Sequence, residues 1–208
     1  MVPTKLVLLS SWLPTRAWYR GDGEPDLRIA GGFRLDDPGG EVGIEFMAIT
    51  DHAAELAWAY HVPLTYRASP LAGADEGLVG TALHGVLGKR WIYDAARDPV
   101  AVAEIVALLA GRAKPQAQSE SGTSDPTVAI HAAETIIPTN EFGPAQESLS
   151  YTDIPVGQRA VRLHRLLDAT GAPAEACGSG YVIAPWRTAE GAAARSVFLS
   201  FAERPRER

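Results

Sequence analysis

The chain has 208 residues, of which 46% are hydrophobic and 21% are charged, so it can bury a core and is not wholly disordered. Its formal net charge of −6 argues against a nucleic-acid partner, because phosphate backbones are bound by clustered Lys and Arg. The length suits one domain or two small ones. It argues against a complete (β/α)8 barrel of the glycosidase type, which usually needs about 250 residues.

The segment from Met1 to Leu13 does not read as a secretory signal. Its apolar run, residues 6–9, is short, and two serines interrupt it before any small-residue cleavage site. No stretch of about 18 residues is wholly apolar, so we expect a cytoplasmic protein with no membrane partner. The single cysteine, Cys177, excludes an internal disulfide and a zinc site built from several cysteines.

The first third of the chain predicts an antiparallel sheet. Its four expected strands cover residues 28–35, 41–49, 58–67 and 90–93. A turn over residues 36–40, Asp-Asp-Pro-Gly-Gly, separates the first two. In the second strand Val42, Ile44 and Phe46 alternate with Glu41, Gly43 and Glu45, which predicts a half-buried strand with a period of two.

The third expected strand carries two further signals. Pro63 lies inside it and predicts a position at the edge of the sheet, because proline cannot donate to a central ladder. Alternation places a row of large side chains on one face, which we expect to face the core: Trp58, Tyr60, Val62, Leu64 and Tyr66.

One helix is well marked, with Asp98 as its N-cap, Pro99 at its first position and Gly111 as its stop. Its apolar stripe consists of Val102, Ile105, Val106 and Leu109. A helix of about thirteen residues is marginal alone, so we expect it to pack on the concave face of the preceding sheet. Residues 1–113 therefore predict an α+β domain, a curved antiparallel sheet with one main helix.

The composition changes after this domain. Residues 114–126 hold no large apolar side chain and predict a linker. Residues 127–208 predict a small, mostly antiparallel β domain. Its expected strands are 127–131, 159–167 and a hairpin that pairs 180–186 with 194–201.

A search for reactive groups assigns no catalytic, cofactor-binding or metal-ligating residue. The five histidines lack the spacing of a helical metal site; they are His52, His61, His84, His131 and His164. The glycines of residues 80–85 and 88–90 do not complete a phosphate-binding loop. The paired acids at 36–37 and 75–76 lie in turn-like segments and are read as solvated turn residues.

Aromatic residues are crowded into the first 93 positions. One reading is that they form core and half-buried sheet surface. The other is a carbohydrate platform or a protein interface, where Trp and Tyr are favoured. For an interface we single out Trp18 and Tyr19, because they follow Pro14 and Arg16 in an irregular segment rather than on a sheet face.

Four segments in order resemble the N-terminal cap domain of actinobacterial maltokinases. They are Leu13-Pro-Thr-Arg-Ala-Trp-Tyr19, Val62-Pro-Leu-Thr-Tyr-Arg67, Leu78-Val-Gly-Thr81 and Trp91-Ile-Tyr-Asp-Ala-Ala-Arg-Asp-Pro99. The resemblance implies a cystatin-like cap, an antiparallel sheet with a helix. In the full kinases this cap precedes a kinase-like body that phosphorylates maltose or a related sugar with ATP and Mg²⁺.

The second half leaves two interpretations open. Residues 127–208 are similar to a degenerate kinase N-lobe segment, with Arg162 near the position of the nucleotide-binding lysine, or they form an unrelated small β domain. The chain has no His-Gly-Asp or equivalent catalytic loop, and phosphoryl transfer needs such a base together with magnesium ligands. Arginine does not replace that lysine, because its planar fork differs from a point charge.

The resemblance therefore implies a stand-alone, non-catalytic accessory or interaction module in α-glucan, trehalose and maltose 1-phosphate metabolism, with no cofactor of its own. Its expected partner is a sugar kinase or a trehalose- or α-glucan-converting enzyme, and α-glucan itself is a second candidate. The alternatives are a carbohydrate-binding module, or part of a split sugar kinase or α-glucan branching enzyme. Proteins similar to this one are often labelled α-glucan branching proteins, although the length argues against such catalysis.

Overall fold

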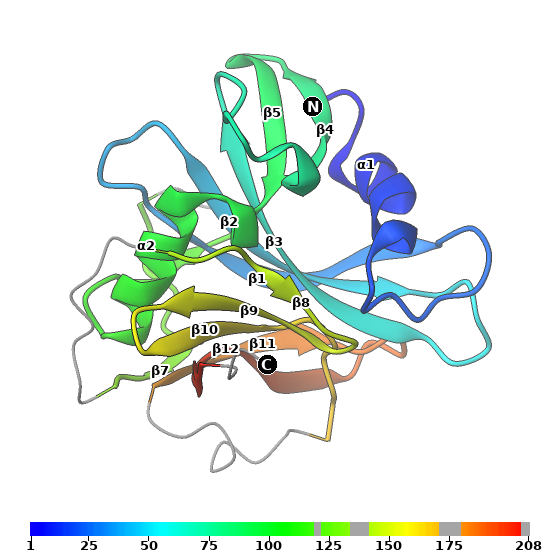
Figure 1. The fold of residues 1–208 in the computed structure, drawn as a ribbon. Helices are drawn as coiled ribbons and strands as arrows, with labels where there is room; N and C mark the ends of the chain where they lie inside the picture. The colour runs from blue at the N-terminus through cyan, green and yellow to red at the C-terminus, as the bar shows by residue number, and fades with distance from the viewer. Residues whose placement is uncertain (119–121, 134–141, 171–179, 205–208) are drawn as a thin grey trace.

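The computed structural model describes residues 1–118, 122–133, 142–170 and 180–204, which form two six-stranded antiparallel sheets (Figure 1). The first sheet has the strand order β4-β5-β3-β2-β1-β6 and the second has the order β7-β11-β12-β10-β9-β8. These described residues are thus mostly β, with two short α-helices among them. No helix among the described residues has the length and apolar character needed to cross a membrane. Cys177 lies outside the described residues.

The elements follow one another along the chain in a simple order. The first sheet and its helices comprise α1 (Lys5–Trp12), β1 (Leu27–Leu35), β2 (Gly43–Asp51), β3 (Trp58–Arg67), β4 (Leu78–His84), β5 (Gly88–Asp94), α2 (Pro99–Leu109) and β6 (Gln116–Ala117). The second sheet comprises β7 (Ala129–His131), β8 (Gln146–Glu147), β9 (Tyr151–Val156), β10 (Arg159–His164), β11 (Tyr181–Arg187) and β12 (Ala193–Glu203). Three 3₁₀ turns are η1 (Leu13–Thr15), η2 (Asp75–Gly77) and η3 (Ala95–Arg97).

The four strands predicted in the first third are confirmed as β1, β2, β3 and β5, whereas α1 and β4 were missed. The β4 pairing shifts register at Gly80, whose φ is +156°, so the period-two pattern is broken there. Helix α1 has only eight residues and no regular apolar stripe; packing holds it in place, since Leu9 and Trp12 are buried. The Thr4 side chain caps it by accepting from the amide of Val7.

The prediction that Pro63 marks an edge strand is wrong, because β3 pairs with β2 on one side and with β5 on the other. A backbone N–H at position 63 would point to the same side of β3 as the N–H of His61, which donates to the carbonyl of Arg165. The β5 pairing begins only at Leu64. Pro63 therefore lies in a gap between two neighbours, where the ladder loses no hydrogen bond.

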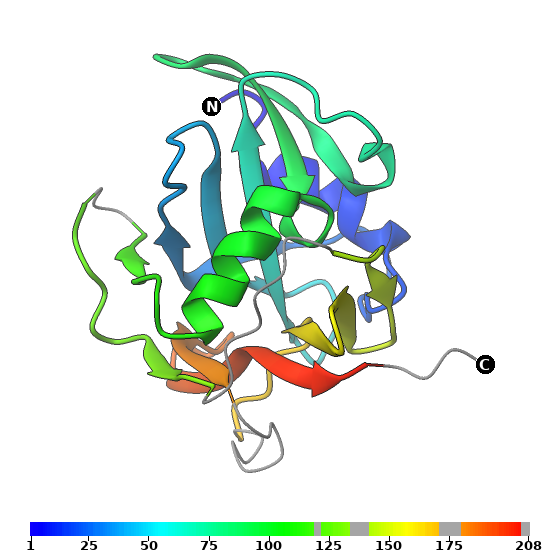
Figure 2. The ribbon, with the colours of Figure 1, turned by 60° about the vertical axis from the view of Figure 1, so that its left-hand side comes forward.

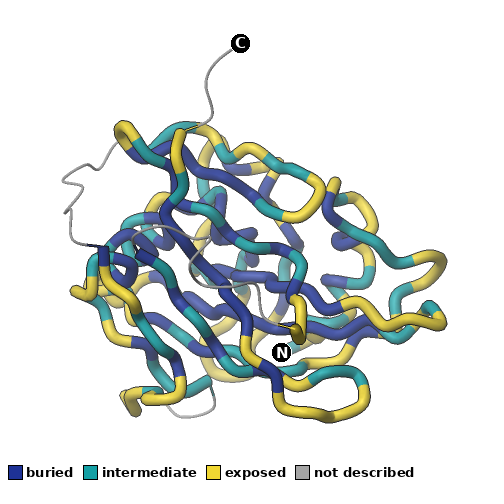
Figure 3. Tube along the Cα trace, turned by 90° about the horizontal axis from the view of Figure 1, so that it is seen from below, coloured by how far each residue is buried: buried dark blue, intermediate teal, exposed yellow. Residues whose placement is uncertain are grey.

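β2 and most of β3, at the centre of the first sheet, are buried on both faces, so the expectation of a half-buried β2 is wrong (Figure 3). We call the two apolar layers the α1-side cluster and the α2-side cluster. The α1-side cluster includes Leu9, Trp12, Leu13, Trp18, Met47, Ile49, Tyr60, Val62, Leu64 and Ile92. The α2-side cluster includes Phe33, Ile44, Phe46, Val102, Ile105, Leu109, Ile154, Val161, Phe198 and Leu199. The expected core row on β3 is confirmed at Tyr60, Val62 and Leu64, while Trp58 is 38% exposed.

Helix α2 forms as predicted. The Asp98 carboxylate accepts from the amide of Val100, Pro99 opens the first turn, and Gly111 follows the helix with a φ of +71°. Its stripe packs in one cluster with residues of both sheets rather than against the first sheet alone. Figure 2 shows its C-terminal end above the second sheet, where Leu109 accepts from the amide of Ala133.

The second sheet contains the predicted strands as β7, β10 and the β11–β12 hairpin, together with β8 and β9, which were not predicted. Within the segment read as a linker, β6 pairs with β1 at Phe33 and Arg34. The domain boundaries at 113 and 127 stay a prediction.

A buried ion pair joins the two sheets where the chain leaves β10. Arg165 is fully buried, and its guanidinium donates to Asp94 at 2.5 Å and to Thr152 at 2.8 Å. The same guanidinium lies 4.9 Å from the ring of Trp18. Asp94 ends β5 and also caps η3 by accepting from Ala96. A single arginine therefore connects the second sheet to the first sheet and to the α1-side cluster.

Candidate functional site

Trp18, one of the two residues singled out for an interface, is 0% exposed. Its ring packs against Trp12 and Tyr60, with ring centroids 5.9 Å apart in both pairs. Tyr19 is half-buried and donates its hydroxyl to Asp51 at 2.8 Å. Burial, and then the Asp51 carboxylate, raise the pKa of Tyr19 above its ordinary value. Trp18 is therefore part of the α1-side cluster, and an interface contact through Tyr19 stays a prediction.

The two tryptophans that are not buried, exposed Trp58 and half-buried Trp91, do not form a continuous platform. Trp58 begins β3, and Trp91 pairs with Arg67 at the other end of the same strand. Nine residues of strand separate these positions by about 30 Å. The Trp91 ring also carries the ammonium of Lys89 at 4.7 Å from its centroid. A sugar chain stacked across both rings would have to span the length of the sheet.

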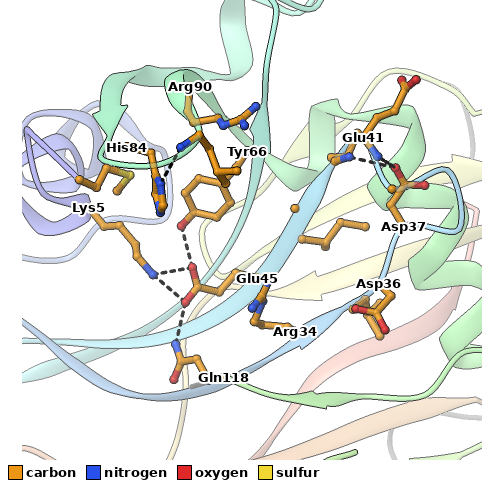
Figure 4. A pocket seen from close by; sticks show the side chains of 17 residues that line it. Lys5, Arg34, Asp36, Asp37, Glu41, Glu45, Tyr66, His84, Arg90 and Gln118 are labelled. Carbon is orange, nitrogen blue, oxygen red and sulfur yellow. Dashed lines mark hydrogen bonds and ion pairs between the residues drawn. The ribbon is translucent and has the colours of Figure 1, made fainter. Parts of the chain in front are cut away.

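A polar cavity of about 650 Å³ lies beside the N-terminal end of α1 (Figure 4). Its walls are α1, the β1–β2 turn and the β4–β5 hairpin, which projects from the body in Figure 1. The side chains that define its floor are Lys5, Arg34, Glu45, Tyr66, Arg90 and Gln118. Sequence reasoning missed this cavity, because Lys5 and Gln118 are 40 and 73 positions from Glu45.

Strand register explains why these side chains meet. Arg34 pairs with Glu45 across β1 and β2, so both point to the same face of the sheet. Tyr66 follows two positions after Leu64, which pairs with Glu45, so it shares that face. This is the face that α1 covers further along, where Leu64 belongs to the α1-side cluster. The cavity is therefore the part of this face that the short helix leaves uncovered.

Glu45 is 5% exposed and is the centre of the floor. Its carboxylate accepts from Lys5 Nζ at 2.7 and 2.8 Å, from Tyr66 Oη at 2.6 Å and from Gln118 Nε2 at 3.0 Å. Burial raises the pKa of Glu45, but the charge and hydrogen bond of Lys5 together with the hydrogen bonds of Tyr66 and Gln118 outweigh it, and the pKa lies below its ordinary value. Four hydrogen bonds saturate this carboxylate, so it holds α1, β3 and the segment after α2 together.

The β1–β2 turn forms the acidic wall of the cavity, from Asp36, Asp37 and Glu41. The Asp37 carboxylate accepts from the backbone amides of Gly39, Glu41 and Val42 at 2.8 to 2.9 Å. These amide bonds hold the pKa of Asp37 below its ordinary value, although burial acts to raise it. The reading of residues 36–37 as turn residues is thus confirmed.

Arg90 supplies a donor without a matching acceptor. Its Nε atom is buried and has no hydrogen-bond partner among the described residues. A buried donor without an acceptor is unfavourable for folding. This atom is closed off from the cavity, so a group that enters can meet only the rest of the Arg90 side chain, which lines the cavity. Within the described part of the chain, no three His, Cys, Asp or Glu side chains lie close enough to hold a metal ion.

These features define a mostly β protein with a cavity on the uncovered part of its first sheet. Residues 12–98 match the family model of the maltokinase N-terminal cap domain, and this segment, from the end of α1 to the N-cap of α2, belongs to that domain family. No curated protein matches the chain. The resemblance stated from the four segments is confirmed. Arg34, Glu45, Tyr66 and Arg90 lie inside the matched segment, whereas Lys5 and Gln118 lie outside it.

Proposed function

We propose that the chain is a non-catalytic accessory module of the cystatin-like cap type, acting in the cytoplasm in α-glucan, trehalose or maltose 1-phosphate metabolism. Its partner in this proposal is a sugar kinase or an enzyme that converts trehalose or α-glucan. The observation that carries the proposal is the homology of residues 12–98 to the maltokinase cap, which implies a maltose and α-glucan context.

The buried acidic groups support a structural rather than a catalytic use of the fold. Asp98 is fully buried and receives two hydrogen bonds from Arg67, at 2.6 and 2.7 Å. Asp153 receives two hydrogen bonds from Arg162, both at 2.8 Å. Each carboxylate is neutralised by a two-bond ion pair with a planar guanidinium, whereas a magnesium ligand or a catalytic base needs a carboxylate that is free to face the substrate.

Arg162 is the residue that the resemblance places near the position of the nucleotide-binding lysine of the kinases. Besides its two bonds to Asp153, its guanidinium lies 3.7 Å from the centroid of the Tyr151 ring. A cation held in this way is a fixed part of the second sheet. This favours a β domain that supports the cap over one that binds ATP.

The first experiment measures turnover by the purified chain with ATP, Mg²⁺ and either maltose or trehalose. We expect no sugar-dependent release of ADP. Turnover by the chain alone would refute a non-catalytic role. Turnover that appears only with a second polypeptide would replace the proposal by a split kinase, and growth of α-glucan branches would replace it by the enzyme alternative.

The second experiment identifies the partner by affinity capture from the native cytoplasm with the tagged chain. The exposed surface beside Trp18 is altered by Ala17→Arg, and an equally exposed alanine is altered by Ala68→Arg as the matched control. We expect a sugar kinase or a trehalose- or α-glucan-converting enzyme to be captured by the wild type and the control and less well by Ala17→Arg. Capture only of proteins outside this metabolism would contradict the proposal.

A further inference from the structure

The cavity beside α1 has the dimensions of a small-molecule site. Its volume of about 650 Å³ falls within the range of roughly 300 to 1,000 Å³ that is usual for such sites. Its floor is rigid, because Glu45 is fixed by hydrogen bonds from Lys5, Tyr66 and Gln118, which come from three different segments. A ligand would therefore meet a preformed surface and would lose little binding energy to ordering the protein.

Gly43 makes room at the centre of this floor. A Cβ atom built there would lie 3.5 Å from the ring of Tyr66, which is ordinary van der Waals contact. The backbone of Gly43 is not in the left-handed region, so a larger residue can be accommodated by the main chain. The absence of a side chain at this position is thus not demanded by the strand. It leaves open space between the two walls of the cavity.

The charges that line the cavity nearly balance. Three basic side chains, Lys5, Arg34 and Arg90, face four acidic ones, Asp36, Asp37, Glu41 and Glu45, for a formal sum of −1. Lys5 and Glu45 neutralise each other, and Asp37 is bound to the turn amides. Arg90 contributes its guanidinium to the lining, while Asp36 and Glu41 are exposed carboxylates of the β1–β2 turn.

We propose that this cavity binds an uncharged, polyhydroxylated ligand of about the size of a disaccharide or trisaccharide. Hydroxyl groups both donate and accept, so one molecule can accept from Arg90 and donate to Asp36 and Glu41. An anion would be repelled by the acidic wall, and a cation by Arg90 and Arg34. The inference rests on the proposed role in α-glucan metabolism only for the choice of sugars tested.

The test is isothermal titration calorimetry on the full chain with maltose, maltotriose and trehalose, supported by saturation-transfer NMR. Glucose 6-phosphate and the dipeptide alanyl-alanine serve as anionic and zwitterionic probes. We expect a dissociation constant in the millimolar range or below for at least one neutral sugar and weaker binding of both charged probes. No binding of any neutral sugar up to about 10 mM would overturn the inference, and so would tighter binding of a charged probe.

Two variants locate the site. Gly43→Leu fills the cavity, and Arg90→Met removes the guanidinium that lines it; each is expected to weaken binding at least about tenfold. Because Arg90 Nε has no acceptor, Arg90→Met is expected to leave the melting temperature unchanged or higher, which separates a binding role from a structural one. If Gly43→Leu proves unstable by circular dichroism, Arg90→Met alone decides.

Trp58→Ala is the matched control, because Trp58 is the exposed aromatic at the far end of β3. We expect it to bind sugar like the wild type. Loss of binding in Trp58→Ala, with retention in Arg90→Met, would overturn the cavity and assign the sugar to a surface aromatic. These results are independent of partner capture and ATP turnover, so the proposed function and this site can fail separately.

Discussion

The ion pair between Arg165 and Asp94 leads to a direct test of how the two sheets hold together. Arg165→Met keeps most of the side-chain volume but leaves Asp94, whose side chain is 3% exposed, without its cation. Removing one partner of a buried pair typically costs about 3 to 5 kcal/mol, and the lost contact with Trp18 adds up to about 2 kcal/mol. Most domains are stable by only about 5 to 15 kcal/mol, so the variant loses a large part of its free energy of unfolding.

The assay is urea unfolding followed by both tryptophan fluorescence and far-ultraviolet circular dichroism. Trp18 reports on the α1-side cluster, because it is fully buried beside Arg165. If the sheets unfold as one unit, the two signals give coincident transitions in the wild type and the variant. We also expect Asp94→Asn to be destabilising and the double variant to cost at least about 2 kcal/mol less than the sum of the single changes.

The control is Arg28→Met, which breaks an ion pair to Asp26 whose side chains are 63% and 57% exposed. That change is expected to cost less than about 1 kcal/mol. The reasoning would be refuted by a cost below about 1 kcal/mol for Arg165→Met, or by additive single changes in the cycle. Separate transitions for the two probes would show that the sheets are independent units.

Three further predictions concern buried polar groups. Burial lowers the pKa of His164 from 6.5 to about 4, so below pH 6.5 the unfolded chain binds a proton there that the folded chain does not. This group alone should lower the free energy of unfolding by about 3 kcal/mol between pH 6.5 and pH 4, and buried His61, whose pKa is also lowered, adds to the fall; His164→Gln should make the slope shallower in urea titrations. Glu45→Gln removes the anion that holds Lys5 and should lower the free energy of unfolding by about 1 to 3 kcal/mol. We also expect faster proteolysis before residue 16, and unchanged cleavage would contradict the anchoring role. Asp98→Ala removes both the cap of α2 and the partner of Arg67, and should lower the free energy of unfolding by about 3 to 5 kcal/mol in chemical denaturation. Asp98→Asn should lower it less, and equal losses in the two variants would argue against the ion pair.

Local patterns were sufficient wherever one segment carries its own signal. The Asp98–Pro99 start of α2 could be read directly, because a cap and its helix are neighbours in sequence. The turn at Asp37 could be read for the same reason, since its carboxylate binds amides within five residues. The cap-like segments could be recognised because they occur in the same order as in the family, within residues that match its model. The helix cap and the turn depend on contacts that are short in sequence, and each cap-like segment is itself only a few residues long.

Pairing between distant segments could not be read in this way. Trp18 follows Pro14 and Arg16 in an irregular stretch, which suggested exposure, but Arg165 and the α1-side cluster cover it. Pro63 suggested an edge, but the chain after β10 and the start of β5 leave a gap beside it. In both cases the burial of a residue was decided by a neighbour that comes from elsewhere in the chain.

The sequence by itself thus determined the cap-domain family, α2 with its ends, and most of the strands, since helix caps, turns and alternation act over a few residues. Only the tertiary structure decided that both faces of the central strands β2 and β3 are covered and that Lys5, Glu45, Tyr66 and Gln118 meet at one cavity. The physical reason is that burial and hydrogen bonding depend on which segments pack together. Strand order and register set that packing, and neither is encoded in the spacing of nearby residues.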